Sequence, residues 1–215
     1  MIQAEQLTFS YTNMAPFVLS GLNLSVPDGA YVSVVGENGS GKSTLMRLLL
    51  GFLKPTSGMI LTDAKRIGYV PQRSEVHAFP ITVYEVLNAY RKLLHLPSKD
   101  SVMQALEQVQ MTSFRNELIG NLSGGQRQKI MLIRAMMGDP DLLILDEPST
   151  GVDIGSQQEI YRFIKELNVE RGKTIISVEH NLDAAIRNST SIYHLVNGKG
   201  HLCSPEKYAQ EFIQG

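Results

Sequence analysis

Gly36-Glu37-Asn38-Gly39-Ser40-Gly41-Lys42-Ser43-Thr44 carries the most specific spacing of residue types in this chain. It fits the pattern G-x-x-x-x-G-K-[ST], in which backbone amides of a glycine-rich loop surround phosphate groups. The apolar, β-branched run Tyr31–Val35 precedes it, and the apolar, helix-compatible run Leu45–Leu50 follows it. A strand, a glycine loop and a helix in this order are the context that the motif requires. The sequence therefore predicts a phosphate-binding loop at residues 36–44.

The residue types of this loop suit a nucleoside triphosphate. Glycines let backbone N–H groups approach the phosphates, and a helix N-terminus adds unpaired donors and a partial positive charge. Lys42 is expected to reach the β- and γ-phosphates, and the Ser43 hydroxyl is expected to bind Mg²⁺. The alternative, a glycine turn with an incidental lysine, is disfavoured because every fixed position of the motif matches in the right context.

The bulk composition is that of an ordinary globular protein. The 215 residues are 43% hydrophobic and 19% charged, with a net charge of −1, which gives no support to a polyanion-binding surface. No run approaches the roughly 18 apolar residues of a membrane span, and the N-terminus does not resemble a secretion signal. The single cysteine, Cys203, excludes an internal disulfide framework and suits a reducing cytosol.

Residues 2–35 are expected to be rich in β-structure. Apolar residues alternate with polar ones at Leu7, Phe9 and Tyr11, and a second such run covers Val18–Val26. Tyr11 has two interpretations. It either stacks on an adenine ring or packs at the edge of a strand, as aromatic residues often do.

The middle of the chain changes from strands to helices. Short strands are expected at Met59–Leu61 and Arg66–Val70, and Gln72 follows at the end of the second, where α/β sheets place ligand contacts. From Thr82 to about Met137 the apolar spacing is helical, which predicts a small helical subdomain.

Two motifs toward the end of this region carry further chemistry. In Leu122-Ser123-Gly124-Gly125-Gln126, Ser123 is a helix cap and the paired glycines leave the helix N-terminus open to an anion. A fully buried strand over Leu142–Leu145 then ends in Asp146-Glu147. One of these carboxylates can hold a hydrated Mg²⁺, and the other can orient or deprotonate a water molecule.

The last third of the chain is expected to continue the α/β pattern. Residues 148–153 lead into a helix that runs to about Asn168, and Lys173–Val178 is a strand that ends at Glu179-His180. A lone histidine at a strand end is more often structural than functional. A hairpin is predicted at Asn197-Gly198, and a terminal helix after Pro205.

The predicted hairpin would bring two histidines and the cysteine close together. If the turn centres on Asn197-Gly198, His194 faces His201 and Cys203 lies on the same face of the hairpin. Such a set has borderline metal-ligand geometry. The alternative is a packed or hydrated strand pair without a metal.

The chain resembles the nucleotide-binding subunit of ATP-binding cassette (ABC) transporters over nearly its whole length. The resemblance rests on five features in a fixed order: the loop at 36–44, Gln72, Leu122–Gln126, the strand ending in Asp146-Glu147, and His180. The resemblance implies an α/β fold: a P-loop NTPase core of mixed or parallel sheet flanked by helices, an antiparallel β subdomain and an inserted helical signature subdomain. Residues 1–72 and 139–215 would form the core and β subdomain of a single domain, and residues 73–138 the helical subdomain.

The resemblance also implies roles for individual residues. Tyr11 would stack on adenine, Thr150–Asp153 would be the D-loop, and Ser123 and Gly125 would touch the γ-phosphate of ATP held by an opposite subunit. The implied catalytic residues are Glu147, His180 and Gln72. The implied metal ligands are Ser43, Gln72 and Asp146. The implied nucleotide-binding residues are Tyr11, Gly36, Glu37, Asn38, Gly39, Ser40, Gly41, Lys42, Ser43, Thr44, Ser123, Gly124, Gly125, Gln126 and Asp153.

ATP and Mg²⁺ are the cofactors that this resemblance implies. The implied partners are polytopic membrane permease subunits, a second copy of the chain with ATP at the interface and, indirectly, an extracytoplasmic metal-binding protein, with no nucleic acid. The implied location is the cytoplasmic face of the membrane. Phe79, Ile81 and Tyr84, together with the residues just after Gln72, are expected to form the groove that receives the permease.

The segments Ile67–Arg73 and Phe79–Val86 resemble those of the ATPases of bacterial zinc and manganese uptake systems, and zinc is favoured over manganese. An importer for another substrate, or an exporter, is the runner-up. A soluble ABC ATPase acting on nucleic acid or ribosomes is a further alternative. It is disfavoured because residues 73–121 leave no room for a long coiled-coil arm and the chain holds a single cassette.

Overall fold

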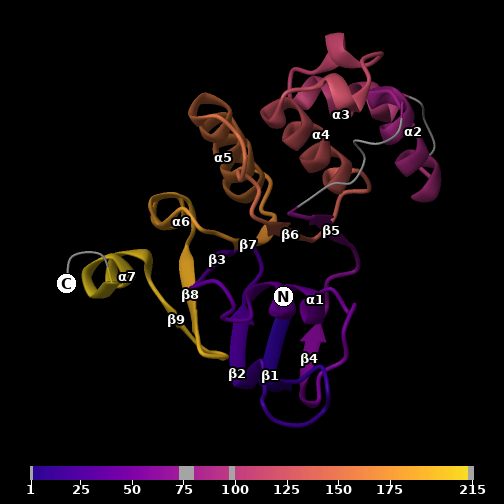
Figure 1. Ribbon diagram of the computed structural model, residues 1–215. Helices are drawn as coiled ribbons and strands as arrows, with labels where there is room; N and C mark the ends of the chain where they lie inside the picture. Colours follow the sequence, from indigo (N-terminus) through magenta and orange to yellow (C-terminus); the bar gives the residue numbers. More distant parts are fainter. Residues whose placement is uncertain (1, 73–79, 97–99, 213–215) are drawn as a thin grey trace.

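A six-stranded sheet runs through the centre of the protein, in the strand order β5-β6-β7-β3-β8-β9 (Figure 1). The computed structural model describes residues 2–72, 80–96 and 100–212. The strands of this sheet are β5 (Ile67–Val70), β6 (Leu142–Asp146), β7 (Thr174–Val178), β3 (Tyr31–Val35), β8 (Ser191–Val196) and β9 (Lys199–Cys203). Neighbouring strands from β5 to β8 pair in parallel, and β9 pairs antiparallel with β8. Every residue of β3, β6 and β7 is buried, as expected of parallel strands covered on both faces.

A smaller antiparallel sheet has the strand order β2-β1-β4. Its strands are β2 (Leu19–Val26), β1 (Ile2–Phe9) and β4 (Ser57–Thr62). The prediction of strand structure as far as Tyr11 is wrong, because β1 ends at Phe9. The chain turns there: the Ser10 hydroxyl donates a hydrogen bond to the carbonyl of Met14 at 2.5 Å, and Asn13 has a φ of +60°. Tyr11 therefore lies in a turn beyond the sheet.

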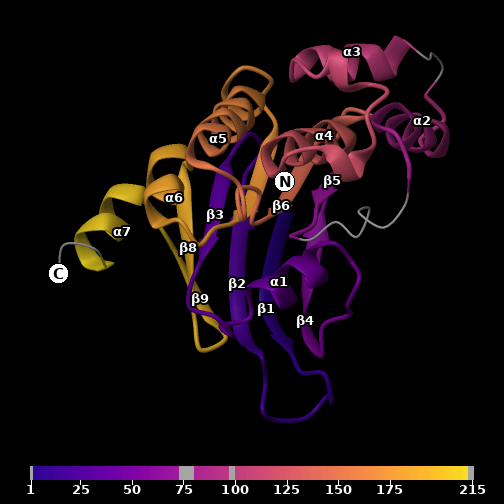
Figure 2. The same ribbon diagram turned by 45° about the horizontal axis from the view of Figure 1, so that its top comes forward.

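Helix α1 (Lys42–Leu49) packs between the two sheets. Its buried side chains Leu45, Met46, Leu48 and Leu49 belong to one apolar cluster together with residues of β1, β2, β3 and β6. Helix α5 (Ile154–Val169) contributes to a second cluster, which also contains residues of β5, β6 and β7. Helices α6 (Leu182–Asn188) and α7 (Pro205–Phe212) lie beside β8 and β9 (Figures 1 and 2). The α/β class with a mainly parallel sheet and a separate antiparallel sheet is confirmed.

Helices α2 (Val83–Leu93), α3 (Asp100–Gln108) and α4 (Gly124–Met136) gather at the end of the molecule away from the antiparallel sheet (Figure 1). Short 3₁₀ turns at Thr112–Phe114 and Ile119–Asn121 connect α3 with α4. Both α2 and α4 begin with a capping box, made by Thr82 with Glu85 and by Ser123 with Gln126. The assignment of residues 73–138 as an inserted subdomain stays a prediction.

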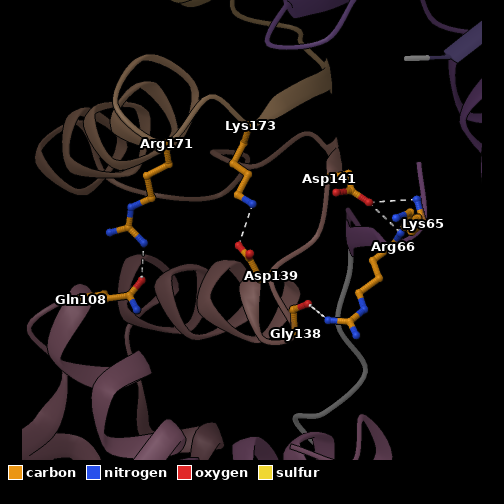
Figure 3. Close-up of polar contacts among 8 residues, drawn as sticks. All are labelled: Lys65, Arg66, Gln108, Gly138, Asp139, Asp141, Arg171 and Lys173. Carbon is orange, nitrogen blue, oxygen red and sulfur yellow. Dashed lines mark hydrogen bonds and ion pairs between the residues drawn. The ribbon is translucent and has the colours of Figure 1, made fainter. Parts of the chain in front are cut away.

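Polar contacts hold the segment between α4 and β6 in place (Figure 3). Gly138 and Asp139 both have positive φ values, of +90° and +53°. The Arg66 guanidinium donates to the Gly138 carbonyl at 2.5 Å, and Lys173 forms an ion pair of 2.6 Å with Asp139. The backbone N–H groups of residues 65 and 66 donate to the Asp141 carboxylate at 2.9 and 3.1 Å. These contacts tie the end of α4 to the sheet and fix where β6 begins.

Candidate functional site

The predicted phosphate-binding loop connects β3 with α1 by a close backbone turn. Gly36 and Gly41 have φ values of +152° and +105°, in the region that favours glycine. A Cβ atom on Gly36 would lie 2.2 Å from the Leu195 carbonyl oxygen, and one on Gly41 would lie 2.7 Å from a methyl carbon of Leu19. Glycine is therefore required at both positions for steric reasons.

Lys42, at the first turn of α1, folds back over this loop. Its ammonium group donates to the carbonyl oxygens of Gly36 and Glu37 at 2.7 and 2.9 Å. The residue is 6% exposed, and burial lowers the pKa of its ammonium group despite the nearby carboxylates of Asp146 and Glu147. An ammonium group has three donor protons, so one remains for a ligand in the cleft beside the loop.

A cleft of about 310 Å³ lies beside this loop. The cleft is lined by Val18, Asn38, Gly39, Gly41, Lys42, Ser43, Thr44, Gln72, Glu147 and His180. Gln72 follows β5, Glu147 follows β6 and His180 follows β7 closely, so side chains far apart in sequence meet at the carboxyl edge of the parallel strands. The structure thus brings together the predicted catalytic residues and most of the phosphate-binding loop.

Glu147 is held in one orientation at the end of β6. Its φ of +53° lies in the left-handed region, which is uncommon for a residue with a side chain. His180 Nε2 lies 2.7 Å from one carboxylate oxygen, the Thr150 hydroxyl donates to the other at 2.9 Å, and the Gln72 side chain also hydrogen-bonds to the carboxylate. Burial acts to raise the pKa of Glu147, but these hydrogen bonds outweigh it and leave the pKa below its ordinary value. The carboxylate is therefore ionised at neutral pH.

The neighbouring Asp146 has a different environment. It is 7% exposed, and burial together with the charge of Glu147 raises its pKa above the ordinary value. Its Oδ1 atom is buried and has no hydrogen-bond partner within the described part of the chain. A buried carboxylate oxygen without a partner is costly, and a cation bound beside it would offset that cost. A carboxylate oxygen of this kind suits a hard divalent ion such as Mg²⁺.

The lining leaves out Gly36, Glu37 and Ser40 of the loop, Asp146, and three further groups of predicted site residues: Tyr11, residues 123–126 and Asp153. Tyr11 is 61% exposed, and its hydroxyl lies 3.3 Å from the Thr44 hydroxyl. The Ser123 hydroxyl accepts from the Gln126 backbone N–H at the start of α4. Asp153 caps α5 by accepting from the N–H of Ser156 at 3.0 Å.

The signature glycines pack against the start of α5. A Cβ on Gly124 would lie 3.0 Å from the Gly151 carbonyl oxygen, and one on Gly125 would lie 2.4 Å from the Cβ of Ser156. Residues 123–126 and Asp153 thus share one surface. A single copy of the chain does not bring this surface to its own phosphate-binding loop, since neither segment lines the cleft.

The predicted hairpin pairing is correct, but of the two interpretations of its side chains, the one that makes His194, His201 and Cys203 metal ligands is wrong. Asn197 and Gly198 turn with φ values of +49° and +73°, and His194 pairs with His201 as the sequence predicts. Among the residues that the structure describes, no group of three or more histidine, cysteine, aspartate or glutamate side chains could hold a metal ion. Aromatic rings of α7 occupy the space instead, with Phe212 at 4.5 Å and Tyr208 at 5.2 Å from the His194 ring.

Comparison with known proteins identifies the family. Residues 19–150 match the family described as ABC transporter. The chain is 52% identical over 211 residues to a Treponema pallidum protein named "Probable metal transport system ATP-binding protein", which covers 97% of this chain and 88% of that protein. This chain belongs to the ABC transporter ATP-binding family. It is an ATP-binding ATPase subunit of a membrane transport system.

Other relatives of this ABC ATPase agree over nearly its full length. It is 35% identical over 215 residues to the high-affinity zinc uptake system ATP-binding protein ZnuC of Bacillus subtilis, covering 93% of this chain and 92% of that protein. A dimeric bacterial ABC transporter cassette superposes with a TM-score of 0.81 and 26% identity, covering 95% and 99% of the two chains. The protein cbiO1 of Clostridium perfringens, part of the ABC transporter complex cbiONQ, gives 0.86 and 26%, covering 98% and 90%. In the described residues, none of the helices has the length and apolar character needed to cross a membrane.

The sequence did not predict the roles of three side chains near this ABC site, although it placed Thr150 in the D-loop segment. Val18 lines the cleft, and the Thr150 hydroxyl holds the Glu147 carboxylate. Thr150 could have been found, because a hydroxyl residue three positions after a carboxylate can close a tight turn onto it. Nothing in the sequence marks Glu179, which is 2% exposed and lies between the end of β7 and His180.

Glu179 is embedded in hydrogen-bonding side chains. The Tyr161 hydroxyl donates to one of its carboxylate oxygens at 2.7 Å, and the Ser177 hydroxyl donates to the other at 2.5 Å. Burial raises the pKa of Glu179 to about 7, although both hydrogen bonds act in the opposite direction. The folded protein therefore holds the Glu179 proton more tightly than the unfolded chain does.

This difference makes stability depend on pH. Between the unfolded value of 4.5 and the folded value of about 7, the unfolded chain binds fewer protons, so the free energy of unfolding falls as pH rises. Glu179→Gln removes this titration. We expect the stability of the wild type, relative to Glu179→Gln, to decrease from about pH 4 to about pH 8 in urea unfolding. A constant difference over that range would contradict the raised pKa.

Proposed function

We propose that this ABC ATPase energises the import of a divalent metal ion, zinc rather than manganese, by hydrolysing ATP in the cleft beside residues 36–44. One observation supports a hydrolytic site: the phosphate-binding loop, Gln72, Glu147 and His180 all line the same cleft. The names of the relatives support the metal substrate, since they include a metal transport and a zinc uptake ATP-binding protein. An importer for another substrate, or an exporter, is the alternative.

The phosphates would bind against the loop between β3 and α1. Backbone N–H groups at the N-terminus of α1 would surround them, and Lys42 would contribute its remaining proton to the β- and γ-phosphates. Tyr11, beside Thr44 and largely exposed, would stack on the adenine ring. Together these contacts would orient the triphosphate with its γ-phosphate toward Glu147.

Glu147 would orient and polarise the attacking water. Its lowered pKa keeps the carboxylate ionised, and its three hydrogen bonds hold it at the cleft. His180 would contact the γ-phosphate through the ring that also meets Glu147. Gln72 lies on the same cleft and would sense the reacting water and the transmembrane partner.

The Mg²⁺ ligands would be Asp146, Ser43 and Gln72. The buried Oδ1 of Asp146 without a partner, and the position of Ser43 on the cleft, support this set. When bound, the ion would neutralise charge on the β- and γ-phosphates. Asp146 would thus bind the ion, and Glu147 would orient the water.

A second copy of the chain would complete the site. Residues 123–126 and Asp153 form one surface outside the cleft, and the N-terminus of α4 suits an anion. In a two-fold dimer, this surface of one subunit would cover the γ-phosphate bound to the other. The similarity to a dimeric cassette supports this arrangement.

The transport complex would require separate membrane permease subunits. Contact with them would place this chain at the cytoplasmic face of the membrane, and an extracytoplasmic protein would supply the metal. The substrate assignment is tested by metal uptake in cells that lack this chain. We expect zinc uptake to fall and to return when the chain is supplied, with manganese uptake unchanged. Loss of manganese uptake alone would contradict zinc, and unchanged uptake of both metals would contradict metal import.

A second prediction concerns the permease groove. Phe79 and the residues just after Gln72 lie outside the described residues, but Ile81 and Tyr84 are half-buried at the start of α2. Tyr84→Asp should abolish uptake because it places a charge in the docking groove, whereas ATP binding by the isolated subunit should be retained. Leu93→Asp, at the exposed far end of the same helix, is the control and should leave uptake intact. Uptake that survives Tyr84→Asp would move the groove elsewhere.

A third prediction separates the two carboxylates. Glu147→Gln keeps shape and hydrogen bonding but removes the charge, so ATP should still bind while hydrolysis falls on the order of 10²-fold or more. The variant should accumulate as an ATP-bound dimer in size-exclusion chromatography, and not with ADP. Asp146→Asn should instead weaken the dependence of hydrolysis on Mg²⁺. Near-normal turnover by Glu147→Gln would assign the base to another residue, with His180 the first candidate.

A further inference from the structure

A buried chain of hydrogen bonds lies behind the Glu147–His180 pair. Ser149 and Tyr161 join through their hydroxyl oxygens at 2.8 Å, and Tyr161 donates to Glu179 at 2.7 Å. The Ser177 hydroxyl donates to the other oxygen of Glu179. Because Tyr161 gives its only hydroxyl proton to Glu179, Ser149 must be the donor to Tyr161. The chain therefore runs in one direction and ends on the carboxylate.

The two ends of this chain are next to the two cleft side chains. Ser149 is two residues after Glu147, and Glu179 directly precedes His180. One backbone contact joins these two segments, since the N–H of residue 147 donates to the Val178 carbonyl at 3.1 Å. The N–H of residue 179 instead donates to the Val34 carbonyl at 3.1 Å, which ties the segment after β7 to β3. Tyr161 comes from α5, so a helix outside the cleft bridges the segment after β6 to the segment after β7.

We infer that Tyr161 and Glu179 are positioning residues that hold Glu147 and His180 in register with each other across the cleft. The inference rests on the proposed roles of Glu147 and His180. The Glu147–His180 contact of 2.7 Å is made by side chains whose backbones belong to different strand ends, so its length depends on how those ends are held together. Tyr161 supplies a side-chain bridge between them that reaches Ser149 on one side and Glu179 on the other.

The composition of the cluster favours positioning over packing. Ser149, Tyr161 and Glu179 are at most 8% exposed. Burying a carboxylate costs free energy. Apolar side chains of similar volume at the same buried positions often stabilise a fold equally well or better. A fully hydrogen-bonded polar cluster instead fixes one arrangement of the groups attached to it. Small displacements of catalytic groups are expensive, since a misplacement of about 1 Å can cost on the order of 10²-fold in rate.

Tyr161→Phe tests the inference in the full chain, because it removes the bridging hydroxyl and keeps the ring. We expect kcat for ATP hydrolysis to fall roughly tenfold, with KM for ATP unchanged, since binding contacts remain and only the alignment of the reacting groups is lost. The matched control is Tyr193→Phe. Tyr193 is fully buried, donates to the Asn23 carbonyl at 2.8 Å and is not among the residues that line the cleft, so loss of its hydroxyl should lower the melting temperature without changing kcat.

Further variants cover the case in which Tyr161→Phe does not fold. Ser149→Ala removes the far end of the chain with a smaller change and should reduce kcat in the same direction. Glu179→Gln, which retains one acceptor oxygen, should keep more activity than Glu179→Leu. Unchanged kcat in both Tyr161→Phe and Ser149→Ala overturns the inference, as do equal losses in Tyr161→Phe and Tyr193→Phe.

The proposed hydrolytic site is tested separately by Glu147→Gln. If Glu147→Gln stops hydrolysis and Tyr161→Phe does not slow it, the positioning inference fails while the proposed site stands. If Glu147→Gln retains turnover, the role of Glu147 fails, and with it the reason for holding Glu147 and His180 in register.

Discussion

Parallel pairing among β6, β7 and β3 is the constraint on which the cleft depends. Because these strands run in the same direction, their carboxyl ends meet at one edge of the sheet and bring Glu147 and His180 to the loop that follows β3. The loop itself depends on a close backbone approach, since a side chain at Gly36 would collide with the Leu195 carbonyl of β8. Lys42 then closes the loop by binding two of its carbonyl oxygens.

Asp146 and Glu147 are adjacent carboxyl groups at this edge of the sheet, and their environments shift their pKa values in opposite directions. Burial and the neighbouring charge raise the pKa of Asp146, whereas hydrogen bonds lower the pKa of Glu147 despite its burial. Carboxylates whose environments move their pKa values apart are suited to different tasks. Glu179 is a third carboxyl group near this edge, and its enclosure by Tyr161 and Ser177 keeps it out of the cleft.

Local signals in the sequence predicted much of the fold and of the site. Ser123 caps α4, Asn197-Gly198 forms the hairpin turn, and the strand ending at Asp146 has the expected start at Leu142. Each depends on residues close in sequence: a hydroxyl before a helix, two positions with positive φ, and a run of buried apolar residues. The extension of strand structure to Tyr11 failed because a turn closed by Ser10 overrides the alternating pattern.

The sequence by itself determined the ABC family, because specific motifs occur in it in a fixed order, and the fold that this resemblance implies includes both sheets. Only the tertiary structure decided which side chains meet. The hairpin pairs His194 with His201 as expected, but Tyr208 and Phe212 of α7 pack against these rings, where one of two interpretations placed a metal. The contacts that hold Glu147 come from Gln72, Thr150 and His180, and the cluster behind it joins Ser149 to Glu179 through α5. Such contacts link residues distant in sequence, and neither periodicity nor motif spacing encodes the packing that brings them together.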